Sequence, residues 1–201
     1  TAVFCFLKSN EGLSAPDIQI NFTPGTHRRG MQSTLENQAG FTMATWQHRP
    51  ESYGYVRARS QDPFKHPEIQ PNYLAADTDQ QVILAAIKIC RKLAQTEALK
   101  PFVVEETFPS IACQNDNDLL NSAREIGQSI YHLMGTCRMG SRDDKTAVVD
   151  AELRVHGIKN LRVIDASIMP TMVSANLNAA VMMIAEKGAD MVLGKLSSKP
   201  H

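Results

Sequence analysis

Apolar and polar residues alternate along several short segments in the first third of the chain. Val3–Leu7 is an apolar run typical of a strand, and residues 17–22 alternate strictly, which predicts a half-buried strand. Further strands are expected at 41–46 and 53–59. Successive strands with short links favour an antiparallel sheet. Residues 24–40, with three glycines, predict a mobile loop instead.

Two later segments carry apolar residues at helical spacing. The first begins near Thr78, which would form a capping box with Gln81. Its apolar stripe predicts packing on the sheet, and we interpret this helix as scaffold. The second begins near residues 115–116 and turns Leu119 and Leu120 inward.

The stretch from Ser129 to Asp190 differs, because its polar groups gather at the ends of apolar elements, where functional sites are usually built. His132 precedes a glycine turn. A β-like run, Leu161–Ile164, ends in Asp165-Ala166-Ser167. A further helix is predicted from about Asn178 onward.

Taken alone, each polar residue of this stretch has a structural interpretation beside the functional one. A histidine beside a glycine turn, such as His132, is more often a structural hydrogen-bonding residue than a base. Asn176 would be a helix cap or a turn residue, and Asp165 would cap a turn. His156 lies at a turn between strands and is interpreted as structural.

Methionines are frequent in the same stretch. We interpret them as core residues rather than as a functional stripe, because the flexible thioether fills irregular gaps. Two of them, Met134 and Met172, could also line an apolar substrate pocket. The others considered are Met139, Met169, Met182 and Met183.

Composition narrows the classes of function. The 201 residues suffice for one domain with a core, or for one domain and part of another. Lys+Arg and Asp+Glu both number 21, and the zero net charge argues against a general nucleic-acid or anionic-membrane binder. The apolar run around Ala179–Ala185 is too short to cross a bilayer. Four cysteines without CxxC spacing favour free thiols in a reducing compartment, such as the cytoplasm, over a disulfide framework or a metal site.

The motifs of this stretch, in their order and spacing, resemble the C-terminal end of the glucose–methanol–choline (GMC) family of flavin oxidoreductases. The match weakens upstream to Tyr53, and residues 1–52 are placed by position only. Leu133, Ala179 and Ala180 depart from the residues of most relatives. The matching motifs are Tyr131-His132-x-x-Gly135-Thr136-x-Arg138-Met139-Gly140, Val149-Asp150, Arg154-Val155-x-Gly157, Leu161-Arg162-Val163-x-Asp165-Ala166-Ser167 and Asn176-x-Asn178 with Met183-Ile184-Ala185-Glu186-Lys187.

The resemblance implies FAD-dependent oxidation of an alcohol CH–OH to a carbonyl, by a choline-dehydrogenase-like dehydrogenase or an oxidase. The family's GxGxxG loop, which holds the ADP half of FAD, is absent from this sequence. The chain is therefore expected to be the C-terminal part of a longer enzyme. Its partner would be the N-terminal FAD-binding portion, and alone it would bind FAD weakly and be inactive.

The same resemblance assigns roles to individual residues. His132 would be the base that accepts the hydroxyl proton, and Asn176 a hydrogen-bonding partner, since an amide cannot act as a base at neutral pH. Flavin contacts would come from the helix N-terminus, where the backbone amides stabilise negative charge on the reduced flavin, and from a strand end. The cofactor-binding set is Tyr131, Asp165, Ala166, Asn178 and Ala179.

The expected fold class is α+β. Residues 1–127 would form a substrate-binding domain, an antiparallel sheet with helices on one face. Residues 128–201 would complete a Rossmann-like FAD domain, with Leu161–Ile164 as an added strand. A hydroxynitrile lyase on the same fold and a non-catalytic isolated fragment stay as alternatives. The alcohol, the electron acceptor and the oligomeric state stay open.

Overall fold

The chain forms two compact units in the computed structural model, which describes residues 3–28, 31–174 and 176–195. Unit 1 comprises Thr1–Gly54 and Pro71–Gln128, and unit 2 comprises Tyr55–Gln70 and Ser129–His201. The chain thus leaves unit 1 after Gly54 and returns to it at Pro71. The assignment of residues 1–127 to substrate binding and of 128–201 to flavin binding stays a prediction.

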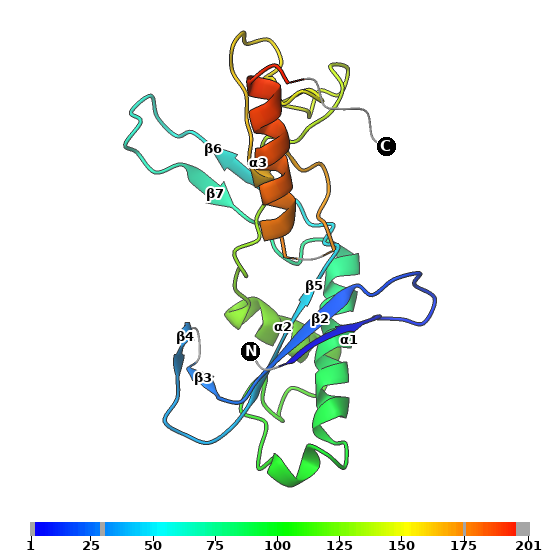
Figure 1. The fold of residues 1–201 in the computed structure, drawn as a ribbon. Helices are drawn as coiled ribbons and strands as arrows, with labels where there is room; N and C mark the ends of the chain where they lie inside the picture. The colour runs from blue at the N-terminus through cyan, green and yellow to red at the C-terminus, as the bar shows by residue number, and fades with distance from the viewer. Residues whose placement is uncertain (1–2, 29–30, 175, 196–201) are drawn as a thin grey trace. The chain divides into compact units, whose positions relative to one another are not determined.

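Unit 1 is built on a three-stranded antiparallel sheet in the order β1-β2-β5 (Figure 1). These strands are β1 (Val3–Leu7), β2 (Ile18–Thr23) and β5 (Thr42–Gln47). Leu7 lies opposite Ile18. The three strands predicted from the alternation in this region are confirmed.

The central strand β2 is buried on both faces over its first half, so the prediction of a half-buried strand was wrong there. Gln19 is 1% exposed although its neighbours Ile18 and Ile20 already point into the core. Its side-chain oxygen pairs with Nε2 of buried His48 at 2.8 Å, and Phe6 packs edge-on against the same imidazole. The polar side chain of Gln19, on the face of β2 opposite Ile18 and Ile20, is therefore buried against the polar side chain of His48.

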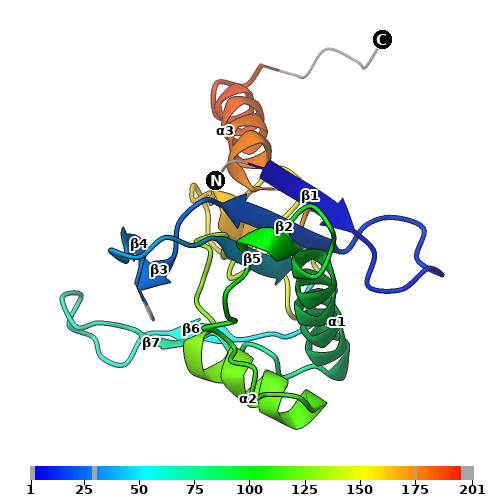
Figure 2. The ribbon, with the colours of Figure 1, turned by 90° about the horizontal axis from the view of Figure 1, so that it is seen from below.

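Two helices cover unit 1. Helix α1 (Asp77–Ala94) packs on the sheet through Val82 and Ala86, as predicted (Figures 1 and 2). Helix α2 (Asp116–Ile126) packs on α1 through Leu119 and Leu120, which confirms their inward orientation. A short 3₁₀ helix, η1 (Lys100–Phe102), lies between them in the chain.

The predicted capping box of α1 was wrong. The N-cap is Ala76, which offers no side-chain acceptor, and the polar contacts of the first turn come from Asp79 instead. This 2% exposed carboxylate accepts the backbone N–H groups of Glu51 and Ser52, both at 2.9 Å, and the Ser52 hydroxyl. The Ser52 oxygen in turn accepts the N–H groups of Ala75 and Ala76, each at 3.0 Å. We call these contacts the Asp79–Ser52 clamp.

Two segments differ from their predictions. The predicted loop 24–40 contains an antiparallel pair, β3 (His27–Arg28) and β4 (Met31–Leu35), which is too short for its alternation to stand out. The predicted strand 53–59 shrinks to β6 (Tyr55–Arg57) and does not join the sheet. It pairs with β7 (Glu68–Gln70) in unit 2, because the chain leaves unit 1 after Gly54.

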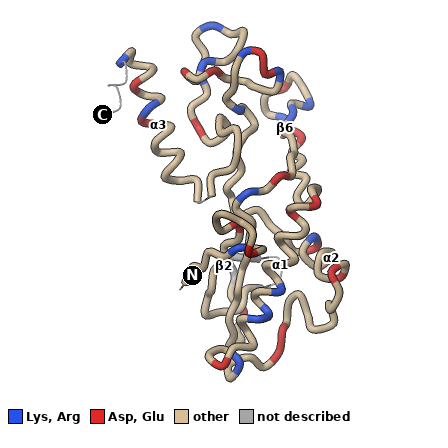
Figure 3. Tube along the Cα trace, turned by 90° about the vertical axis from the view of Figure 1, so that its right-hand side faces the viewer, with Lys and Arg blue, Asp and Glu red and all other residues tan. Residues whose placement is uncertain are grey.

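Unit 2 has few regular elements besides β6 and β7. They are helix α3 (Asn178–Val192), which confirms the predicted start at Asn178, and the 3₁₀ helix η2 (Ala166–Ile168). The first half of α3 carries no charged residue, whereas its second half carries charges of both signs (Figure 3). No helix in the described part of the chain is both long and apolar enough to cross a membrane.

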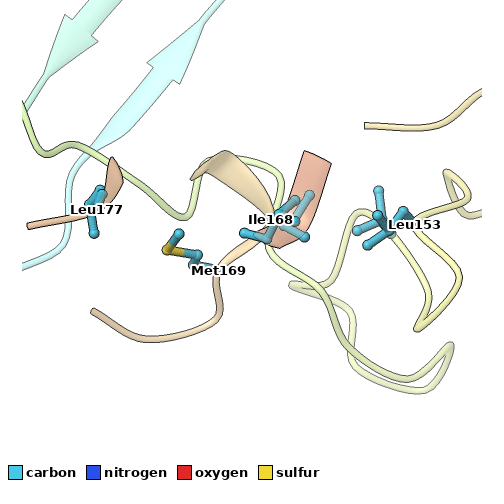
Figure 4. Packing of buried hydrophobic residues seen from close by; sticks show 6 residues of the cluster. Leu153, Ile168, Met169 and Leu177 are labelled. Atoms are coloured by element: carbon cyan, nitrogen blue, oxygen red, sulfur yellow. The ribbon is translucent and has the colours of Figure 1, made fainter. Parts of the chain in front are cut away.

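The core of unit 2 lies between loops and α3. Leu153, Ile168, Met169 and Leu177 pack together with Val149 and Ile184 (Figure 4). Three of the predicted core methionines pack against this cluster around buried Met169, namely Met134, Met139 and Met172. The prediction was wrong for the two on α3, because Met182 is 61% and Met183 57% exposed.

The predicted strand Leu161–Ile164 is reduced to one bridge. Arg162 pairs with Arg154, flanked by hydrogen bonds from Val155 N–H to Leu161 O at 3.0 Å and from Val163 N–H to Leu153 O at 3.1 Å. A strand requires a longer ladder of hydrogen bonds, and residues 153–155 supply only this short one. Within each unit the fold is therefore α+β, with small antiparallel sheets in both.

Candidate active site

Two polar side chains that are 44 residues apart in the sequence meet in unit 2. The amide Nδ2 of Asn176 lies 2.8 Å from Nε2 of His132. An amide nitrogen donates a hydrogen bond, so in this arrangement Nε2 is the acceptor. His132 thus presents an acceptor nitrogen to a hydrogen-bonding partner.

The backbone on either side of His132 adopts unusual conformations. Tyr131 has a φ of +63°, and the Ser129 hydroxyl oxygen accepts its N–H at 3.0 Å. Gly135 has a φ of +85°, and a Cβ there would lie 3.3 Å from the carbonyl oxygen of Met169. A left-handed non-glycine residue is uncommon and is often found at functional sites. The Tyr131 side chain itself is 84% exposed.

The loop after His132 is held along η2 by backbone hydrogen bonds. Every second residue from Gly135 to Met139 donates its backbone N–H to a carbonyl oxygen of η2, each to the next residue along. These bonds are Gly135 to Ala166 at 3.4 Å, Cys137 to Ser167 at 2.9 Å and Met139 to Ile168 at 2.7 Å. The predicted base and the predicted flavin-binding turn are therefore parts of one hydrogen-bonded structure.

Asp165 is the N-cap of η2. Its Oδ1 accepts the N–H of Ser167 at 2.8 Å and also the Ser167 hydroxyl. This confirms the structural interpretation of Asp165 as a cap. Ala166 begins η2 and is partly buried against the core of unit 2.

Helix α3 begins two residues after Asn176. Its N-cap, Leu177, is buried in the core and provides no side-chain acceptor for the amides of the first turn. Asn178 and Ala179, both exposed, occupy that turn, and the Asn178 amide contacts only the Met182 sulfur at 3.8 Å among the described residues. Free N–H groups and the helix dipole make this end favourable for negative charge.

The turns between residues 140 and 160 carry the other polar motif residues. His156 contacts the Gly140 carbonyl through Nε2 at 3.2 Å, which supports its structural interpretation. Burial would raise the pKa of Asp150, but hydrogen bonds from the N–H and guanidinium of Arg154 and from the N–H of Glu152 outweigh it and lower the pKa. These groups thus stabilise the turn.

An open groove of about 1330 Å³ lies over these turns. It is lined by residues 139–142, 150–151, 154–162 and Val192. None of the predicted site residues lines it. Among the described residues, no group of three or more His, Cys, Asp or Glu side chains could hold a metal ion.

The family model for GMC oxidoreductases matches residues 50–185. The chain belongs to this family. It is 42% identical over 193 residues to mitochondrial choline dehydrogenase of Homo sapiens, and 41% identical over 191 residues to oxygen-dependent choline dehydrogenase of Escherichia coli strain UTI89. Each alignment covers 94% of this chain but only 32% and 33% of the relative. The chain thus spans about a third of the length of these relatives.

Solved structures of GMC-like proteins share the fold. Pyridoxine 4-oxidase from Mesorbium loti superimposes with a TM-score of 0.78 and 26% identity, over 95% of this chain and 37% of that one. A formate oxidase variant from Aspergillus oryzae RIB40, described for an effect on FAD modification, gives a TM-score of 0.76 and 28% identity. That match covers 91% of this chain and 32% of the oxidase.

Sequence reasoning missed two residues that shape the site. Ser129 accepts the Tyr131 N–H, and Ser167 donates twice to Asp165. The signal for Ser167 was present, because an Asp followed two residues later by a Ser favours an Asx turn. Ser129 has a similar local signal, because its hydroxyl oxygen accepts the N–H of Tyr131, two residues later.

Proposed function

We propose that this chain supplies the proton-accepting side of an FAD-dependent site that oxidises an alcohol CH–OH to a carbonyl. Membership of the GMC family supports the chemistry, and the similarity to choline dehydrogenases supports an alcohol as substrate. The observation that carries the proposal is the 2.8 Å contact between Asn176 and His132. The pair forms within unit 2 alone.

The residues of unit 2 fit FAD. Asp165 has one carboxylate oxygen, Oδ2, with no hydrogen-bond partner among the described residues, and the first turn of α3 has no side-chain cap. A carboxylate oxygen suits cofactor hydroxyls, and a helix N-terminus suits the negative end of a reduced isoalloxazine ring. Asp165, Ala166, Asn178 and Ala179 would hold the cofactor, with Tyr131 beside them.

Bound FAD would supply the hydride acceptor, flavin N5. The chain's own residues perform the proton chemistry. A substrate hydroxyl would take the place of the Asn176 amide at His132 Nε2 and give its proton to that nitrogen. The displaced Asn176 amide would donate to the hydroxyl oxygen and fix the direction of the C–H bond. The substrate would lose its hydroxyl proton to His132, and FAD, when bound, would supply the two-electron acceptor that oxidation to a carbonyl requires.

The proposal also assigns a role to each part of the larger enzyme. Unit 1 would form the substrate-binding part, an antiparallel sheet with helices on one face. Unit 2 would complete a Rossmann-like FAD domain. The remaining two thirds of a choline-dehydrogenase-like chain would supply the partner, the N-terminal FAD-binding portion.

The test compares two histidines in the complete FAD-loaded enzyme. His132→Ala should lower turnover by about 10²- to 10⁴-fold with flavin content unchanged, because the base is lost. His156→Ala is the matched control in the same unit, and its turnover should stay close to wild type because the His156 side chain hydrogen-bonds only a turn carbonyl among the described residues. Equal turnover of His132→Ala and wild type would remove the base assignment.

Anaerobic addition of an alcohol panel to the wild type separates the alternatives. Bleaching of the flavin absorbance by an alcohol is the expected result. Cyanide release from a cyanohydrin, with the flavin staying oxidised, would instead identify a hydroxynitrile lyase. An absence of both reactions would favour a non-catalytic role for the chain.

A further inference from the structure

The open groove of unit 2 is lined by an excess of positive charge. Four of its lining residues are Arg or Lys, and only one, Asp150, is acidic. That carboxylate is already used, because it forms an ion pair with Arg154 at 2.9 Å. The whole chain carries 21 basic and 21 acidic residues. The surplus is therefore a local feature of the groove and not a consequence of composition.

The other three cations of the groove keep free donors. Arg142 and Lys159 are exposed and have no ion-pair or hydrogen-bonding partner among the described residues. Arg162 donates its Nε to the Glu152 carbonyl at 3.1 Å, which leaves its two terminal nitrogens without a partner in the same part of the chain. Unpaired cations gathered in a concave surface favour an anionic group.

Apolar side chains are exposed beside these charges. Ile158 is 57% and Leu161 47% exposed on the turn that follows Val155, and Val192, at the end of α3, is 58% exposed. The turn is held by the hydrogen bond from Val155 N–H to Leu161 O at 3.0 Å. The groove thus exists before anything binds in it, and little ordering is required of the turn when an occupant arrives.

The shape and charge of the groove exclude three kinds of occupant. Its volume of about 1330 Å³ exceeds the roughly 300–1,000 Å³ of most small-molecule sites, and it is open. A bilayer surface meets protruding residues and cannot follow a concave one. A second copy bound through the same groove would place like charges opposite each other. An extended chain segment that carries both carboxylates and apolar side chains fits instead.

We propose that this groove receives an acidic, partly apolar segment of the N-terminal FAD-binding portion. The inference rests on the proposed function and names the surface of unit 2 that contacts that partner. About two thirds of the length of the choline dehydrogenase relatives lies outside this chain, so the segment belongs to the same enzyme. Its carboxylates pair with Arg142, Lys159 and Arg162, and its apolar side chains cover Ile158 and Leu161.

Carbodiimide cross-linking of the complete FAD-loaded enzyme tests the contact. The reagent joins a lysine Nζ to a carboxylate that touches it, and peptide mass spectrometry locates both residues. Lys159 should be joined to an Asp or Glu of the N-terminal portion, and Lys159→Arg should abolish that product. Lys145 is the matched control, since it is exposed in the same unit and lies outside the groove. The inference is overturned if Lys159 stays free, or if it is joined only to this chain or to a second copy.

Charge reversal examines the same contact through stability. Lys159→Glu should lower the melting temperature of the complete enzyme by about 2–4 °C at low ionic strength, because attraction becomes repulsion. The shift should shrink at about 1 M salt, where the Debye length is about 3 Å. Lys145→Glu should leave the melting temperature unchanged, and equal shifts in the two variants would overturn the inference.

Anionic vesicles separate the remaining source of negative charge. The wild-type enzyme should sediment with phosphatidylglycerol vesicles no more than Lys159→Glu does, because the groove is already occupied. Sedimentation of the wild type that is lost in Lys159→Glu would assign the groove to a membrane surface and overturn the inference.

These outcomes are distinct from a failure of the proposed function. The proposed function fails if the wild-type enzyme holds no FAD or if His132→Ala keeps full turnover. The inference about the groove fails when FAD is bound and His132 is required, yet Lys159 has no carboxylate of the N-terminal portion beside it.

Discussion

Unit 1 and unit 2 are stabilised in different ways. In unit 1 the apolar faces of regular elements pack together, as Val82 and Ala86 of α1 do against Ile18 and Ile20 of β2. In unit 2 the core residues sit mostly on turns, and backbone hydrogen bonds join irregular segments such as the 135–139 loop and η2. The predicted catalytic pair lies in the irregular unit.

The difference shows where chemistry is easiest to place. A regular strand or helix consumes its backbone donors and acceptors in repeating bonds, so its side chains follow a fixed period. An irregular segment can aim individual side chains, provided that turns and backbone bonds hold it. The left-handed Tyr131 and Gly135 beside His132 are examples of such local control.

The largest change in the free energy of unfolding is expected in the sheet of unit 1, and it tests the comparison between the two units. Ile18 is 0% exposed, and Ile18→Ala should lower the free energy of unfolding by about 2–5 kcal/mol, through lost burial and a cavity. Urea unfolding monitored by circular dichroism measures it. Ile69→Ala on exposed β7 is the control and should change the free energy by less than about 0.5 kcal/mol. Equal losses in the two variants would contradict the burial of Ile18 in the core of unit 1.

The next largest loss of stability is expected at a tight contact in unit 2. A Cβ on Gly188 of α3 would overlap Cγ2 of Ile164, so Gly188→Ala should destabilise the protein by about 1–3 kcal/mol despite its better helix propensity. Urea unfolding is the measurement. Ile164→Ala removes the clashing methyl group, and the double variant should recover part of the loss. Simple additivity of the two changes would refute the clash.

The Asp79–Ser52 clamp gives an effect of comparable size in unit 1. Asp79→Ala leaves the part-buried N–H groups of Glu51 and Ser52 without this acceptor, and should cost about 1–3 kcal/mol in thermal or urea unfolding. Asp77→Ala, in the same helical turn but exposed, serves as the control and should have little effect. If both variants unfold alike, the effect belongs to the helix dipole rather than to the clamp.

The smallest effect is a pH dependence. Burial, with a further contribution from Cys5, raises the pKa of the Cys90 thiol in unit 1 from 9.0 to about 12. The unfolded chain therefore loses this proton first, so stability is full below pH 9 and falls as the pH rises toward 12. The loss should reach about 1 kcal/mol by pH 10. Cys90→Ala should show a flatter decline between pH 8 and pH 10; an identical decline would contradict the raised pKa.

Periodicity predicted unit 1 well where a single face is buried. The apolar stripes placed α1 and α2, which pack inward on one side, and the short apolar runs placed β1 and β5. The periodic pattern was misleading at Gln19. A polar residue there suggested an exposed face, but His48, 29 residues later in the sequence, covers the Gln19 side chain. The pattern also failed at the N-terminus of α1, because the acceptor Asp79 serves a loop that precedes the helix by more than twenty residues.

The residues of the candidate site were predicted from sequence motifs rather than from the spacing of apolar residues. No spacing rule brings His132 and Asn176 together, because the chain between them contains turns whose directions depend on residues such as Gly157, with a φ of +79°. The family resemblance suggested that they act together, and the structure places them in contact. Their catalytic roles stay predictions. Ser167 could have been found from its Asp-x-Ser spacing, since that turn is local.

The Asp79–Ser52 clamp also has a consequence for how the protein could diversify. Asn72 donates to the Tyr53 carbonyl at 2.9 Å, so both ends of the β6–β7 excursion are tied to each other and to the start of α1. A tethered insertion of this kind has its ends fixed whatever its length, and each doubling of the loop costs only about 0.6 kcal/mol of closure entropy. Lengthening or exchanging residues 55–70 would therefore leave unit 1 intact, which makes the hairpin a replaceable module.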